Sequence, residues 1–167
     1  MNDLKRHIRD VPDFPKPGIL FRDIAPLLRD QFPATIDALS SLVSKQQWNN
    51  IDALAGIESR GFILAAALAA RHDKGFVLVR KKGKLPPPVV DHSYSLEYGA
   101  GVLEMQRGNG SLLLVDDVLA TGGTLRAAAD LCIDAGYDIA GLLVLIDLNL
   151  APRFVWGGKS ALRAITY

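Results

Sequence analysis

Several features that mark whole classes of protein are rare or missing in this sequence. Cysteine occurs once among 167 residues, at Cys132, so no disulfide can form within the chain. Its apolar helical surroundings indicate a core side chain rather than a nucleophile. Charge of one sign is not in excess either, because 19 Lys and Arg face 18 Asp and Glu. Without an overall positive field we expect no nucleic-acid partner.

Long apolar runs are missing as well. The longest, residues 62–70, is about half the length needed to span a bilayer. Residues 1–7 lack the apolar stretch of a signal peptide, and we find no repeat, low-complexity tract or linker. We therefore expect a cytoplasmic protein with no membrane partner, folded as one domain over residues 1–167.

Helical and extended apolar segments alternate along the chain. Apolar residues at helical spacing predict a helix that starts near Asp30, with Pro33 in its first turn. Continuous apolar runs predict buried strands. Strands that are apolar throughout and alternate with helices indicate an α/β fold, in which a mainly parallel sheet is covered on both faces. The predicted strands include 76–79, 112–115 and 139–146, and the predicted helices include 62–71 and 122–135.

One segment has a different pattern. Polar and apolar residues alternate in 93–98 and again in 103–106, on either side of the glycine-rich stretch 99–101. Alternation of this kind predicts an antiparallel hairpin that turns at 99–101 and projects from the main sheet.

The most informative segment is 112–124, LLLVDDVLATGGT. A buried strand ends in Asp116 and Asp117, and a loop of small residues then opens a helix. The amino end of a helix offers free N–H groups and the positive end of the dipole, which suit a phosphate, and Gly122 and Gly123 let the backbone close around it. Carboxylates at the end of such a strand fit a ligand that also carries hydroxyl groups, as a ribose does.

Simpler interpretations exist for each part of this segment alone. The two glycines could form an ordinary turn, and the two acids could be solvated loop residues. The segment also lacks the Gly-Lys-Ser/Thr ending of the P-loop and the Gly-x-Gly-x-x-Gly of dinucleotide-binding folds. The predicted phosphate site is therefore of another kind.

Residues 115–124 resemble the motif with which type I phosphoribosyltransferases bind phosphoribosyl pyrophosphate (PRPP). Further segments resemble the adenine phosphoribosyltransferases in the same order, and together they cover most of residues 13–147. The resemblance implies the type I phosphoribosyltransferase fold with an accessory hairpin, or hood. The matching segments are an amino-terminal base-binding segment (about 11–26), a pyrophosphate-binding loop (58–62), and a mobile lid with its hairpin (about 81–106).

The same resemblance implies a reaction. The family transfers the 5-phosphoribosyl group of PRPP to adenine in purine salvage and releases AMP and pyrophosphate. Mg²⁺ is then the cofactor, bound mainly through PRPP and through water to Asp116 and Asp117, which meet the ribose hydroxyls. The 5′-phosphate lies on Ala120, Thr121, Gly122, Gly123 and Thr124.

The remaining roles also follow from the resemblance. Arg60, Ser59, Lys84 and Tyr98 are expected at PRPP, with Arg60 and Lys84 neutralising the pyrophosphate and Glu97 handling the purine proton. A cis peptide between Glu58 and Ser59 is a further hypothesis. Without the family, Arg60 is a surface ion pair, residues 80–84 are a solvated basic loop, and Glu97 is an exposed strand carboxylate.

The choice of base is expected to reside in the main chain. In the family, backbone groups near Leu20 and Arg22 read the purine edge, and Phe21 packs on the ring. Three alternatives stay open: the same chemistry on hypoxanthine or guanine, a PRPP-sensing regulator without activity, and generic nucleotide binding. The family is commonly dimeric, so we expect a homodimer.

Overall fold

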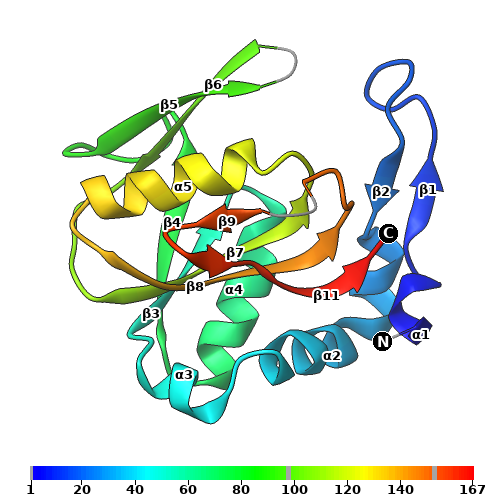
Figure 1. Cartoon of the computed structure of the whole chain (residues 1–167), viewed down its shortest axis with the longest axis horizontal. Helices are drawn as coiled ribbons and strands as arrows, with labels where there is room; N and C mark the ends of the chain where they lie inside the picture. Colours follow the sequence, from blue (N-terminus) through cyan, green and yellow to red (C-terminus); the bar gives the residue numbers. More distant parts are fainter. Residues whose placement is uncertain (1, 97–98, 152–153) are drawn as a thin grey trace.

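The computed structural model describes residues 2–96, 99–151 and 154–167 (Figure 1). The helices are α1 (Asn2–Lys5), α2 (Ala25–Ser41), α3 (Lys45–Asn49), α4 (Arg60–Arg71) and α5 (Gly123–Asp134). The strands are β1 (Arg9–Val11), β2 (Phe21–Asp23), β3 (Ala53–Ile57), β4 (Gly75–Lys81), β5 (Val90–Leu96), β6 (Gly99–Met105), β7 (Ser111–Leu119), β8 (Asp138–Asp147), β9 (Val155–Trp156), β10 (Lys159–Ser160) and β11 (Leu162–Thr166).

The central sheet confirms the predicted α/β architecture. Within the described residues its seven strands follow the order β11-β8-β7-β3-β4-β6-β5. The first five strands in this order run parallel to one another, whereas β6 is antiparallel to both of its neighbours, β4 and β5. The parallel strands place their carboxyl ends at one edge, where ligands bind in sheets of this class.

Side chains of the central strands alternate between two cores. In β7, Leu113 and Val115 point into the core shared with α2 and α4, whereas Leu112 and Leu114 point into the core shared with α5. Helices therefore cover both faces of the sheet (Figure 1). Because residues 112–115 are buried on both faces of the sheet, this part of the strand is apolar throughout.

The helix predicted to start near Asp30 is the second part of a longer, kinked helix. The helix α2 begins at Ala25, and Pro26 lies in its first turn. Gln31 leaves helical geometry (φ −134°, ψ 27°) two residues before Pro33, because a proline ring disturbs the turn that precedes it. The cap-and-proline pattern thus marks a kink inside α2.

The predicted turn at residues 99–101 is also wrong. These residues form the first part of β6 and pair with the end of β5, and the connecting residues 97–98 lie outside the described chain. A Cβ on Gly101 would lie 2.6 Å from the Tyr94 ring, so this glycine makes room for an aromatic ring. The hairpin extends the sheet through the pair Arg80–Glu104, and it lies beside α5 (Figure 1).

The expectation of full burial fails at β4 and α4. Phe76 and Leu78 on β4 are each 37% exposed, and Ile63 on α4 is 44% exposed. The helix α4 covers this face of β4 only in part: the Phe62 ring meets the Phe76 ring edge-on, with centroids 5.9 Å apart. An apolar patch therefore remains on the surface, and we call Ile63, Phe76 and Leu78 the β4 patch.

Close packing of α4 against β7 positions the end of the central strand. Gly61 lies in the first turn of α4, where a Cβ would be 2.8 Å from the Val115 carbonyl oxygen and 3.2 Å from Asp116 Oδ1. Contacts this short are closer than side-chain packing allows. Only glycine lets the amino end of α4 lie directly beside the carboxylate of Asp116.

Candidate active site

A small hollow of about 70 Å³ lies between the end of β7 and the start of α5. Gly122 precedes α5 in the left-handed region (φ 88°), and no side chain caps the helix. The first N–H groups of α5 thus remain open to a bound anion. The hollow brings together most of the residues predicted to bind PRPP: Asp116, Ala120, Thr121, Gly122, Gly123 and Thr124.

Gly122 is required here for a second reason. A Cβ at this position would lie 2.3 Å from the Phe154 ring. The segment after β8 therefore closes over the loop, and any larger residue would displace either the loop or Phe154. Left-handed backbone and close approach both demand glycine.

The two acids at the end of β7 are buried. Asp116 is 8% exposed and Asp117 is 7% exposed, and Asp116 Oδ1 accepts the Asp117 N–H at 2.9 Å. Burial, and next the neighbouring charge of Asp117, raise the pKa of Asp116 well above its ordinary value. Burial also raises the pKa of Asp117, although the charge of Arg60 opposes this effect.

Arg60 connects three parts of the site. Its Nε lies 2.8 Å from Asp117 Oδ2 in an ion pair, and its guanidinium stacks 4.9 Å from the centroid of the Phe21 ring. The pair lacks hydrogen-bond geometry, so Asp117 Oδ2 is a buried oxygen without a hydrogen-bond donor in the described part of the chain. A buried oxygen of this kind lowers the stability of the fold unless a ligand or water donates a hydrogen bond to it.

The peptide before this arginine confirms one hypothesis. Glu58–Ser59 is cis, and Ser59 directly precedes the first residue of α4. Ser59 and Arg60 thus lie where β3 passes into α4, beside the end of β7.

A second hollow, of about 420 Å³, lies beside the first. Arg22 of β2 and the segment before this strand form one side of it, and Ala120 lines both hollows. Two of the predicted adenine-binding residues, Leu20 and Arg22, lie here, whereas Phe21 lines a separate hollow with Phe14. The lining residues are Gly18, Ile19, Leu20, Arg22, Ala120, Leu148, Leu150 and Tyr167.

Tyr167 is a site residue that sequence reasoning missed. Its ring lies between two cations, with Lys5 Nζ and Arg22 Cζ each 3.8 Å from the ring centroid. Asp10 holds the other side of the Arg22 guanidinium in an ion pair. Residues 150–167 carry no recognisable motif, and the contact joins segments from opposite ends of the sequence, so no local pattern could indicate it.

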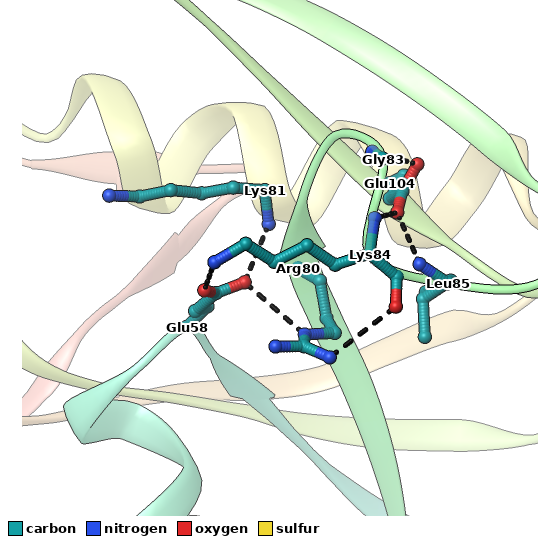
Figure 2. A network of polar contacts seen from close by, with 7 residues as sticks. All are labelled: Glu58, Arg80, Lys81, Gly83, Lys84, Leu85 and Glu104. Atoms are coloured by element: carbon teal, nitrogen blue, oxygen red, sulfur yellow. Dashed lines mark hydrogen bonds and ion pairs between the residues drawn. The ribbon is translucent and has the colours of Figure 1, made fainter.

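The basic loop after β4 is held by Glu58 (Figure 2). Glu58 Oε1 accepts Lys84 Nζ at 2.5 Å, and Oε2 accepts the Lys81 N–H at 3.0 Å and Arg80 Nε at 3.3 Å. Burial raises the pKa of Glu58, but the hydrogen bonds from Lys84 and Lys81 outweigh it, and the pKa lies below its ordinary value. Lys84 and Arg80 are thus directed toward the segment that carries Ser59 and Arg60.

Two predicted residues, Glu97 and Tyr98, lie outside the described residues. Among the described residues, no group of three or more His, Cys, Asp or Glu side chains could hold a metal ion. The donor set at β7 nevertheless suits a hydrated cation, because Asp117 Oδ2 is a buried carboxylate oxygen without a donor. Among the residues that the structure describes, no helix is both long and apolar enough to cross a membrane.

Comparisons with known proteins identify the family of this chain. Residues 28–154 match the model of the phosphoribosyl transferase domain. The chain is 52% identical to adenine phosphoribosyltransferase of Hydrogenovibrio crunogenus over 165 residues, which are 98% of this chain and 96% of that protein.

Solved structures are similar over almost the whole chain. Adenine phosphoribosyltransferase of Rhodothermus marinus is 41% identical with a TM-score of 0.89, covering 99% of this chain and 97% of that one. The enzyme of Saccharomyces cerevisiae, solved with adenine and an imino-altritol bisphosphate, is 32% identical with a TM-score of 0.84, covering 97% and 95%. The predicted type I phosphoribosyltransferase fold is confirmed, and the chain belongs to the phosphoribosyltransferase domain family and, within it, to the adenine phosphoribosyltransferases.

Proposed function

We propose that this chain catalyses, in the cytoplasm and with Mg²⁺, the transfer of the 5-phosphoribosyl group from PRPP to adenine, giving AMP and pyrophosphate. The observation that carries the proposal is the shared wall of the two hollows. Ala120 borders both the phosphate cradle and the hollow beside Leu20 and Arg22. A nucleotide laid across this wall places its phosphate on α5, its base against β2 and its ribose near Asp116 and Asp117.

The protein contributes mainly position and charge to this reaction. Purine N9 replaces pyrophosphate at C1′ of the ribose, which becomes cationic as the bond breaks. The backbone cradle fixes the phosphate end, and the carboxylates of Asp116 and Asp117 accept from the ribose hydroxyls. The two carboxylates also carry negative charge close to the cationic ribose, which favours the transition state. Mg²⁺ supplies charge neutralisation on the pyrophosphate, with Asp116 and Asp117 as the residues that would hold its water.

Pyrophosphate leaves C1′ on the side opposite the purine, and its negative charge needs cations there. Arg60 and Lys84 supply them, and the planar guanidinium suits two phosphate oxygens at once. Glu58 holds Lys84 beside the Ser59–Arg60 segment, so both cations act at one place. Closure of the lid and hairpin over the ribose excludes water, the competing nucleophile. Glu97 receives the purine proton, and Tyr98 contacts PRPP.

Base choice is tested by measuring nucleotide formation from PRPP and Mg²⁺ with adenine, hypoxanthine and guanine in parallel. We expect AMP as the main product, with at least roughly 10⁴-fold discrimination, because a reversed donor and acceptor edge leaves buried backbone groups at Leu20 and Arg22 unpaired. IMP or GMP formation at a comparable rate would overturn the base assignment. Binding of PRPP without product from any base would favour a PRPP-sensing regulator.

Asp116→Asn is expected to stabilise the fold and impair the enzyme. The amide keeps the acceptor for the Asp117 N–H and removes a buried charge. The folded-state pKa of Asp116 is raised, so wild type loses stability as pH rises from the unfolded-state pKa through the folded-state pKa. At pH 8 we expect a gain of about 1 kcal/mol or more in the unfolding free energy, which vanishes below about pH 4, the unfolded-state pKa of Asp.

Urea denaturation at pH 4 and pH 8 measures this change, and exposed Asp138→Asn is the matched control. For Asp116→Asn we also expect kcat/KM for PRPP to fall roughly 10- to 100-fold, the value of a hydrogen bond to a charged acceptor. An Asp116→Asn protein that is less stable at pH 8, or equally active, would contradict this role.

Tyr167→Ala tests whether the Tyr167 ring holds Arg22 of β2 in place for adenine binding. Loss of the ring frees Arg22 and opens the hollow, so KM for adenine should rise roughly 3- to 30-fold, the range of a cation–π contact. KM for PRPP should stay within about twofold, since the phosphate cradle lies beyond Ala120. Tyr167→Phe keeps the ring and should resemble wild type. An unchanged KM for adenine in Tyr167→Ala would refute the role.

The β4 patch supports a homodimer. Ile63, Phe76 and Leu78 expose apolar surface on one side of the sheet, and a second copy of the same patch can cover it across a twofold axis. Light scattering should give the mass of two chains for wild type and of one chain for Phe76→Glu, while Ile133→Glu, at an exposed position of α5, leaves the dimer intact. A monomeric wild-type protein would exclude the assembly.

A further inference from the structure

Glu104 on β6 is a buried carboxylate that binds the backbone of the basic loop (Figure 2). Its Oε2 accepts the Gly83 N–H at 2.9 Å, and its Oε1 accepts the N–H groups of Lys84 and Leu85 at 2.6 and 2.7 Å. The residue is only 3% exposed. Three successive amides thus converge on one side chain from the neighbouring strand.

This contact is stronger than an ordinary turn hydrogen bond. Bonds from N–H groups to a carboxylate are charge-assisted, and burial shields them from competing water. The hydrogen bond from Gly83 above all, opposed by burial, holds the pKa of Glu104 below its ordinary value, so the carboxylate is charged at neutral pH. Gly83 adopts φ 86°, a left-handed conformation that turns the loop toward Glu104.

The loop held in this way carries Lys84. The Lys84 N–H is bound to Glu104 while its ammonium reaches Glu58, the residue after β3. Its carbonyl oxygen accepts Arg80 Nη1 at 3.4 Å. Lys82, on the other side of the turn, pairs with exposed Asp91 instead. The backbone contact therefore separates the two lysines, and it sends only Lys84 toward the segment that carries Arg60.

We propose that Glu104 is a positioning residue, which fixes the backbone of residues 83–85 so that the Lys84 ammonium is delivered to the pyrophosphate of PRPP. This inference rests on the proposed role of Lys84. Glu104 does not touch the substrate and acts through Lys84 alone. A purely structural role in the pairing of β6 with β4 would instead lower stability and affect activity regardless of Lys84.

Glu104→Gln is the informative variant, because its amide places an N–H₂ group where one carboxylate oxygen accepts an N–H. The matched control is Asp91→Asn, since Asp91 lies directly opposite Glu104 on β5 and is also a carboxylate in an ion pair. The activity series compares wild type, Glu104→Gln, Lys84→Ala, the double variant and Asp91→Asn, with kcat and KM for PRPP measured for each.

We expect Glu104→Gln to lower kcat/KM for PRPP by about 10-fold or more, and to cost less than about twofold once Lys84 is alanine, because coupled residues are not additive. Asp91→Asn should match wild type. An equal loss in both backgrounds would overturn the positioning role and leave Lys84 in place. A Lys84→Ala enzyme with full activity would overturn the role of Lys84 itself and the inference that rests on it.

Amide hydrogen exchange tests the contact between Glu104 and residues 83–85 independently of activity. The wild-type protein is measured first. The N–H groups of residues 83–85 should be protected in wild type and in Asp91→Asn, and should exchange at least about 10-fold faster in Glu104→Gln, with protection of β7 unchanged. Exchange of these amides in wild type at the rate of an unstructured peptide would overturn the proposal, whether or not the variants fold.

Discussion

Two adjacent carboxylates buried at the end of a central strand set the main constraint on this structure. Burial raises the pKa of both Asp116 and Asp117, so their ionisation opposes folding and needs compensation nearby. Gly61 allows the amino end of α4 to lie against β7, and this brings Arg60 within 2.8 Å of Asp117. The arrangement is costly for stability and suits a ligand that brings hydroxyl groups and a cation.

Carboxylates at or near the ends of neighbouring strands hold other segments of the chain in place. Glu58 follows β3 and binds the basic loop, and Asp147 at the end of β8 accepts the Asn149 N–H at 2.8 Å and Arg163 at 2.6 Å. Glu104 on β6 binds the backbone of the basic loop in the same way. The central sheet thus holds these segments through charge-assisted bonds, which gives loops the precision that positioning of a reacting ribose requires.

Local patterns in the sequence were sufficient for β4, β7 and β8 and for the order of strand, loop and helix within residues 112–124, but they missed the parallel strand β11. They were insufficient where residues distant in sequence meet. Glu104 looks like one polar position of an alternating strand, and only the pairing of β6 with β4 brings it to the Gly83 turn. Tyr167 reaches Arg22 for the same reason, and the kink at Gln31 resembled a helix start.

We infer that the cradle and the hollow beside β2 are one nucleotide site joined at Ala120. A crystal structure of the protein with AMP tests it most directly. We expect the phosphate within hydrogen-bond distance of the N–H groups of residues 121–124, and the adenine edge on the backbone of Leu20 and Arg22. Adenine bound instead in the hollow between His92, Tyr94 and Arg126, or a phosphate away from α5, would contradict it.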